Sequence, residues 1–239
     1  SVYSIEEDHI NKNLIFCGTE FGVFFSPNRG ERWKALKNGL PTIAVRDIAI
    51  QKRENDLVLG TFGRGFYVLD DYSALRNIEN TKPTAKASIY PIREALMWEK
   101  SMPLGLPGKA FQGDNYYTAT NLDPEAIITY YYDENYKSLK EQRQKKEKEF
   151  IKSESDTPYP NYSSLYSESN EEVPQLVFTI KDASENVVKK VFKKPSKGLQ
   201  RFHWNLRYEE KNPINLNSSS FYNPFAGASE GTLVNPGTF

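Results

Sequence analysis

A repeat of about 42 residues near the start of the chain restricts its possible folds more than any other sequence feature. Residues 13–26 read NLIFCGTEFGVFFS, and residues 55–69 read NDLVLGTFGRGFYVL. The repeated positions are a Gly-Thr pair and, upstream of it, two aliphatic residues: Gly18-Thr19 with Gly60-Thr61, and Val2 and Ile5 with Val45 and Ile48. Short apolar segments separated by glycines, at a period in the low forties, predict blades of a β-propeller.

Within the first unit we expect strands at residues 14–18, 22–26 and 33–36, with a tight turn before the last of them. In this turn Asn28 is a short acceptor for backbone N–H groups, Gly30 permits a positive φ, and Trp33 is expected to pack between sheets. Together with Ser26, these residues resemble the Asp-box of sialidase-type and sortilin-type propellers, S-x-D-x-G-x-x-W, with Asn in the Asp position. The resemblance implies a fold element on the outer turns, away from the ligand face.

The second unit departs from this pattern after Tyr67, because residues 68–71 read VLDD where the turn motif is expected. Residues 57–71 closely resemble the last blade of large sortilin-like proteins of bacteria, BNR-repeat propellers of the "glycosyl hydrolase-like" type. The terminal-blade motif comprises Gly60, Thr61, Gly63, Arg64, Gly65, Asp70 and Asp71. Because a propeller has at least about four blades, the resemblance implies that residues 1–76 are its C-terminal blades. The partner blades would then lie upstream or on another chain.

The period ends in a stretch of linker composition, and the second half reads as an all-β domain. We expect a linker at 77–87 and, at 88–239, an Ig-like or fibronectin-III-like β-sandwich of about seven strands. The expected strands are 87–90, 115–120, 126–132, 175–180, 186–192 and 199–206. Residues 176–207 resemble the Ig-like domain of the flagellar hook-capping family, with Glu185 at the position of a glycine. Residues 236–239 read as the start of a closing strand, so we expect a piece of a larger protein.

An insertion at 134–172 interrupts the predicted sandwich. Residues 134–152 have helical propensity and opposite-charge pairs four residues apart, with almost no apolar face, so we expect a solvated helix. Residues 153–172 are rich in Ser, with Pro158 and Pro160, and are predicted to form an irregular wrap over the sandwich. A helix-plus-wrap insertion of this kind also occurs in the sortilin-like bacterial family.

Composition excludes several classes of function. Lys and Arg total 31 and Asp and Glu total 31, so no basic field favours nucleic acid. No run reaches the roughly 18 apolar residues of a membrane helix, so no direct membrane span is expected. The single cysteine, Cys17, lies in an apolar run and is interpreted as a buried thiol.

The motifs point to architecture rather than to chemistry. The glycine-rich segment 60–65 lies between two predicted strands, not between a strand and a helix, which argues against phosphate binding. Asp70 and Asp71 are neighbours that would point to opposite faces of a strand, so turn capping or a surface role is expected. His9 and His203 have no sequence partner at ligand or triad spacing. We therefore expect no catalytic, cofactor-binding or metal-binding residue.

Three functions remain open at this point. The preferred hypothesis is a non-catalytic extracytoplasmic interaction module, secreted, periplasmic or at the outer cell surface of a bacterium. In it the sandwich supports the last blade and the assembly binds a protein or a glycan. The alternative is an accessory part of a glycoside hydrolase whose catalytic carboxylates lie on upstream blades. A sialidase site would need several convergent arginines; Arg46 and Arg64 are present, and their companions would lie on other blades. The third is a structural spacer.

Overall fold

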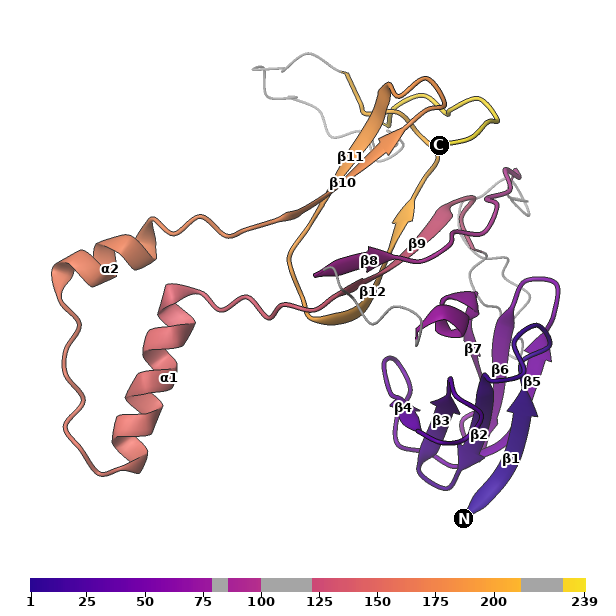
Figure 1. The fold of residues 1–239 in the computed structure, drawn as a ribbon, viewed down its shortest axis with the longest axis horizontal. Coiled ribbons are helices and arrows are strands. Elements are labelled where there is room, and N and C mark those ends of the chain that lie inside the picture. The colour runs from indigo at the N-terminus through magenta and orange to yellow at the C-terminus, as the bar shows by residue number, and fades with distance from the viewer. Residues whose placement is uncertain (79–85, 100–121, 212–229) are drawn as a thin grey trace, which may run out of the picture. The chain divides into compact units, whose positions relative to one another are not determined.

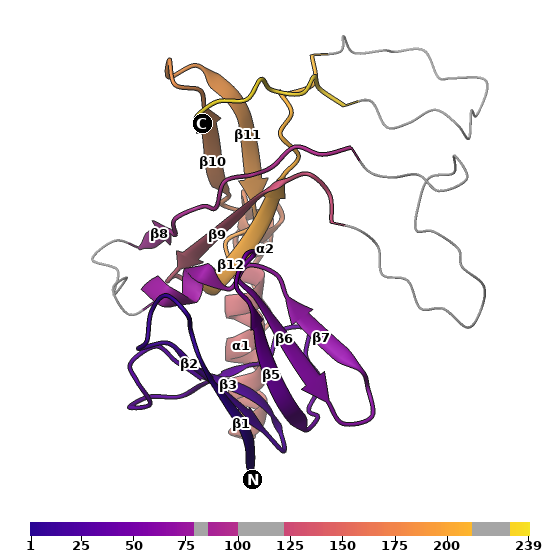
Figure 2. The same cartoon turned by 90° about the vertical axis from the view of Figure 1, so that its right-hand side faces the viewer.

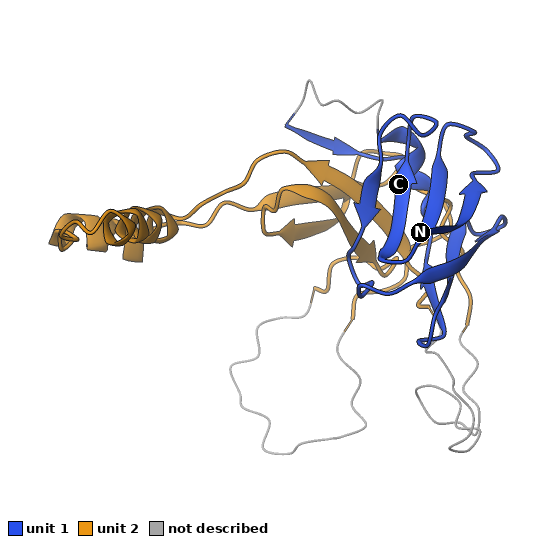
Figure 3. Cartoon of the chain, turned by 90° about the horizontal axis from the view of Figure 1, so that it is seen from below, with its two compact units in different colours: residues 1–91 blue, residues 92–239 orange. Residues whose placement is uncertain are grey.

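The computed structural model describes residues 1–78, 86–99, 122–211 and 230–239. The fold is mostly β, as the sequence predicts. The chain divides into two compact units, residues 1–91 and 92–239, which are coloured separately in Figure 3. Within the described ranges, no helix is long and apolar enough to cross a membrane.

The first unit contains two antiparallel sheets whose strands are neighbours in sequence order (Figures 1 and 2). The first sheet comprises β1 (Val2–Glu7), β2 (Ile15–Thr19), β3 (Gly22–Ser26) and β4 (Lys34–Leu36). The second sheet comprises β5 (Val45–Gln51), β6 (Asp56–Thr61) and β7 (Phe66–Leu69), followed by the short 3₁₀ helix η1 (Ser73–Asn77). The strands predicted from the repeat are confirmed to within a residue at most ends.

The two sheets repeat each other in register as well as in sequence. In each sheet the register of the first strand shifts by one residue, directly after Val2 in β1 and directly after Val45 in β5. An extra residue at this point puts side chains three apart on the same face of the sheet. The bulge therefore explains why the apolar pairs Val2–Ile5 and Val45–Ile48 have a spacing of three rather than two.

One face of each sheet contributes to a shared core. The buried side chains of this core come from both sheets and from the segment after β7: Leu14, Phe16, Val23, Phe25, Val45, Ile48, Leu57, Leu59, Tyr72 and Leu75. Phe16 and Tyr72 meet edge to face, with ring centroids 5.1 Å apart. Burial of about ten large apolar side chains is the main term that holds the two sheets together.

The second unit also has two sheets around one core. One is ordered β12-β9-β8, in which β9 (Ala126–Tyr132) and β12 (Gly198–Trp204) belong to the second unit, whereas β8 (Ala87–Ile89) lies within residues 1–91. The other is the hairpin of β10 (Leu176–Lys181) and β11 (Val187–Lys193). The buried residues of this core come from both sheets and from the segments that follow β12: Ala126, Ile128, Tyr130, Val188, Phe202, Trp204, Leu206 and Val234. The strand expected at 115–120 lies outside the described residues.

Two details of the second unit differ from, or extend, the sequence prediction. The closing strand expected at 236–239 is wrong, because these residues form neither a strand nor a β-bridge. The β-bridge to Arg207 is made by Leu233 instead. Phe239 instead packs against Trp204, with ring centroids 5.2 Å apart. In the β10–β11 turn, Glu185 occupies the glycine position of the hook-capping pattern and adopts the left-handed backbone with a φ of 63°.

The insertion between β9 and β10 consists of two helices, α1 (Leu139–Lys152) and α2 (Tyr162–Ser169). The predicted helix at 134–152 is confirmed from residue 139, where a capping box of Ser138 and Glu141 fixes its start. It has no buried residue, as expected of a solvated helix. The irregular wrap predicted for 153–172 is wrong over α2, which an ion pair of 2.7 Å between Arg143 and Glu168 joins to α1.

Candidate functional site

The turn between β3 and β4, which resembles an Asp-box in sequence, is held by side chains that satisfy backbone groups. The Asn28 Oδ1 atom accepts hydrogen bonds from the Ser26 hydroxyl at 3.0 Å and from the Arg32 N–H at 2.9 Å. The Ser26 Oγ atom in turn accepts from the Gly30 N–H at 2.8 Å, and Gly30 has a φ of 94°. As the sequence predicts, Asn28 accepts a backbone hydrogen bond across the turn and Gly30 adopts a positive φ.

Trp33 departs from the expectation that it packs between sheets. It is 42% exposed, and a Cβ built on Gly30 would lie 3.8 Å from its ring. The indole therefore lies close to the glycine of its own turn and is partly exposed.

The terminal-blade motif closes the β6–β7 hairpin and starts η1. The Thr61 hydroxyl donates to the Gly65 carbonyl at 2.7 Å, and Gly63 and Gly65 both have positive φ. At the other end of β7, Asp71 accepts from the Ser73 N–H at 3.2 Å, while its own N–H donates to Asp56. Asp71 thus caps a turn. The side chains of Thr61 and Asp71 both make hydrogen bonds to backbone groups.

A buried polar cluster that the sequence did not indicate ties the two sheets together. The carboxylate of Asp8, in the turn after β1, accepts from Arg76 Nε at 2.7 Å and Nη2 at 2.8 Å. It also accepts from the Tyr72 hydroxyl at 2.5 Å. Arg76 donates further to the Asn55 side chain at 2.6 Å, in the turn between β5 and β6. Asp8 and Tyr72 are fully buried, while His9 lies at the rim with Nδ1 3.5 Å from the Asp8 carboxylate.

The cluster keeps Asp8 ionised although it is buried. Burial alone would raise the pKa of Asp8, but hydrogen bonds from Arg76, Tyr72 and the Asn11 N–H lower it to about 2. Burial and the adjacent Asp8 carboxylate raise the pKa of Tyr72. The tyrosine is therefore a fixed hydrogen-bond donor and not a nucleophile, and the cluster acts as a structural clasp.

The lowered pKa of Asp8 makes part of the stability depend on pH. Because this pKa lies near 2 in the folded chain and near 3.8 ordinarily, its contribution is present above pH 3.8 and is lost as the pH falls toward 2. Between about pH 6 and pH 2, we expect the wild-type advantage over Asp8→Asn in free energy of unfolding to shrink by on the order of 2 kcal/mol. Urea unfolding of both proteins at the two pH values measures this change. A difference that is the same at both pH values would contradict the lowered pKa.

The outer face of the second sheet has apolar side chains at the same repeat positions as the face of the first sheet that packs in the core. On the first sheet, Phe16, Val23 and Phe25 face the second sheet and are at most 5% exposed. The strand registers make Phe66 and Val68 the equivalents of Val23 and Phe25. They are 79% and 54% exposed. Side chains that fill the core in one repeat are thus in solvent in the next.

The first sheet shows the converse on its own outer face. Val45 and Ile48 of the second sheet face the first sheet and are buried. Their equivalents Val2 and Ile5 lie on the opposite side of the first sheet and are 59% and 64% exposed. Cys17 on this face is buried, as predicted, and its burial raises the pKa of the thiol. Each outer face therefore carries one half of the interface that the two sheets already form.

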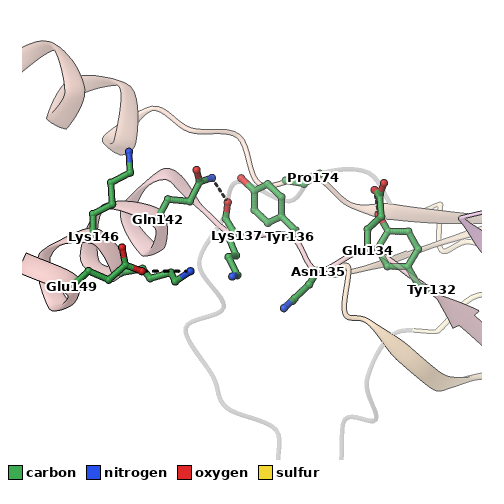
Figure 4. Close-up of a pocket in the computed structure, with 10 residues that line it drawn as sticks. Tyr132, Glu134, Asn135, Tyr136, Lys137, Gln142, Lys146, Glu149 and Pro174 are labelled. Atoms are coloured by element: carbon green, nitrogen blue, oxygen red, sulfur yellow. Dashed lines mark hydrogen bonds and ion pairs between the residues drawn. The ribbon is translucent and has the colours of Figure 1, made fainter. Parts of the chain in front are cut away.

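The insertion carries an open pocket of about 910 Å³ in the second unit (Figure 4). Its lining comes from the segment after β9, from α1 and from Pro174. Several of its polar groups already have partners: Lys145 pairs with Glu149, Gln142 donates to the Lys137 carbonyl, and Tyr132 donates to Glu134. These groups satisfy one another, so the pocket does not present a convergent set of free donors and acceptors.

The described residues hold no group of three or more His, Cys, Asp or Glu side chains that could bind a metal ion. The Nδ1 atom of His203 lies 3.0 Å from a carboxylate oxygen of Glu125. Comparison of the chain with protein-family models, curated proteins and solved structures finds no match.

Proposed function

We propose that the chain is the C-terminal part of a larger β-propeller protein, in which it serves as a non-catalytic module that binds a protein or a glycan outside the cytoplasm. The observation that carries this proposal is the pair of outer faces in the first unit. Val2 and Ile5 on one side and Phe66 and Val68 on the other repeat the two halves of a buried interface. An interface whose halves are different surfaces propagates from copy to copy, and it closes only when a ring of sheets is complete.

The motif residues favour a binding role over a catalytic one. Asn28 and Asp71 accept backbone hydrogen bonds, and Asp8 is neutralised by Arg76 in a buried clasp. These polar groups are committed to the architecture of the turns. The location outside the cytoplasm is proposed from the resemblance of residues 57–71 to sortilin-like bacterial proteins and of residues 176–207 to an Ig-like domain.

The open faces predict that the chain self-associates when it is produced alone. A face that lacks its partner sheet buries apolar area by contact with the complementary face of another copy. We expect the mean mass in solution to rise with protein concentration, and Ile5→Lys or Phe66→Lys to return it toward the monomer. Light scattering after size-exclusion chromatography measures this mass. Val177→Lys, at an exposed valine of β10, is the matched control and should leave the association unchanged. A mass that stays monomeric at every concentration would count against the open faces as docking surfaces.

The binding role itself is tested by comparing retention with turnover on a panel of defined glycans and proteins. We expect the parent protein to retain a ligand without releasing reducing sugar. Release of sugar that is abolished by one carboxylate-to-alanine substitution on an upstream blade would instead establish the glycoside hydrolase.

A further inference from the structure

An arginine in contact with two aromatic rings lies at the end of the first unit where β1 and β5 begin. The Arg46 guanidinium carbon is 3.9 Å from the ring centroid of Tyr3 and 5.4 Å from that of Phe62. Phe62 is fixed beside β5, because its N–H donates to the Ala44 carbonyl at 2.9 Å. Contact with two rings restricts the guanidinium before any ligand arrives, so less rotamer freedom is lost on binding.

The hydrogen-bonding edges of this guanidinium are unused. Across the part of the chain that the structure describes, Arg46 contacts two rings but makes neither a hydrogen bond nor an ion pair. Arg64, in the β6–β7 turn, makes no ring contact, hydrogen bond or ion pair with a described residue. The neighbouring carboxylate of Asp47 accepts a hydrogen bond from the Ile48 N–H at 3.0 Å. Arg46 and Arg64 are thus both exposed, and neither has an acidic partner among the described residues.

Exposed phenylalanines border the same end of the unit. Phe62 in the β6–β7 turn and Phe21 in the β2–β3 turn are each 69% exposed. The hydroxyl groups of these two turns are already donated: Thr19 bonds the Gly22 carbonyl and Thr61 bonds the Gly65 carbonyl. Apolar rings beside unpaired arginines, with the hydroxyls committed, suit an apolar side chain better than the many hydroxyls of a sugar.

We propose that this surface binds an acidic peptide segment, with Arg46 receiving a side-chain carboxylate through its planar fork and Phe62 contacting an adjacent apolar side chain. Arg64 supplies a second positive charge for a neighbouring carboxylate. A guanidinium matches a carboxylate in two-point geometry, and such charge-assisted bonds are the strong ones. This inference rests on the proposed binding role and specifies the chemistry of the partner.

The test is an NMR titration of the 239-residue chain with a synthetic peptide that contains Glu-Phe-Glu-Leu. We expect the Arg46 Nε–Hε signal to shift, and Arg46→Gln to weaken the peptide affinity at least about tenfold. Arg46→Lys keeps the charge but loses the fork, and it should also weaken binding. Arg53→Gln removes an exposed arginine from the turn between β5 and β6 and should bind as the wild-type chain does. Circular dichroism establishes that each variant is folded.

Two further arms identify the source of the carboxylate. The same peptide with Gln in place of Glu should bind at least about tenfold more weakly, and an oligomer of glucuronate should bind more weakly than the acidic peptide. Wild-type affinity in Arg46→Gln, equal binding of the Gln peptide, or tighter binding of glucuronate would each overturn the proposal. These readouts are independent of Ile5 and Phe66, so failure here leaves the docking of further sheets to be decided by the association experiment.

Discussion

The Asp8→Ala variant is expected to unfold about 3–5 kcal/mol more easily than the wild-type chain. Removal of the carboxylate leaves the Arg76 guanidinium in its largely buried position without its counter-ion, and the Tyr72 hydroxyl without its acceptor. The clasp also joins the turn after β1 to the segment after β7, so its loss frees the ends of both sheets. Equilibrium denaturation in urea measures the change.

The control for this prediction removes an exposed carboxylate from the same unit. Asp47→Ala deletes a side chain whose described bond is to the neighbouring Ile48 N–H, and the expected change is within about 0.5 kcal/mol. A double variant, Asp8→Leu with Arg76→Met, removes both charges together and should be less destabilised than the sum of the two single changes. An Asp8→Ala cost no larger than that of Asp47→Ala would show that the clasp does not hold the sheets.

The clasp shows why part of the structure was not predictable from sequence. Asp8 and Arg76 are 68 residues apart, and neither belongs to a local pattern. Only the packing of the two sheets brings the turn after β1 to the segment after β7. The strands of both sheets were predictable because their apolar alternation, their glycines and the repeated Gly-Thr pair are local signals.

The insertion shows a different limit. The start of α1 was readable from the capping box of Ser138 and Glu141, a signal that predicts residue 139 rather than 134. In α2, a run rich in Ser and Tyr has weak helical propensity, and it was interpreted as irregular. The Asn161 side chain accepts from the Ser164 N–H, an N-cap bond that could have indicated the helix.

In the candidate site, too, features set within one turn were predictable from the sequence, whereas features set by tertiary packing were not. Asn28 and Gly30 were assigned correctly because their roles are set within the turn. The exposure of Trp33 was not predicted, because it depends on which sheets are neighbours. The aromatic stacking of Arg46 is also a product of tertiary structure, since Tyr3 and Phe62 come from different sheets.

A comparison of Gly18→Ala with Gly60→Ala gives the second large expected effect, because these glycines occupy equivalent positions of the repeat. A Cβ on Gly18 would lie 2.7 Å from the Val45 carbonyl oxygen and 2.5 Å from the Ser4 hydroxyl. The carbonyl belongs to β5, so relief requires the two sheets to separate. We expect a loss of about 1–3 kcal/mol in the free energy of unfolding, measured by urea denaturation. No measurable loss would contradict the close packing of the sheets at this position.

Gly60 is the matched control because its Cβ would have ordinary contacts only, the nearest being Asp47 at 3.5 Å. Gly60→Ala in the chain alone should therefore be neutral or stabilising by up to about 1 kcal/mol, since alanine restricts the unfolded chain. In a protein that carries the remaining blades, a further sheet on the outer face of the second sheet would place Gly60 where Gly18 is now. The proposed propeller then requires Gly60→Ala to become as costly as Gly18→Ala in the larger protein. If the substitution stays neutral there, no sister sheet packs on that face.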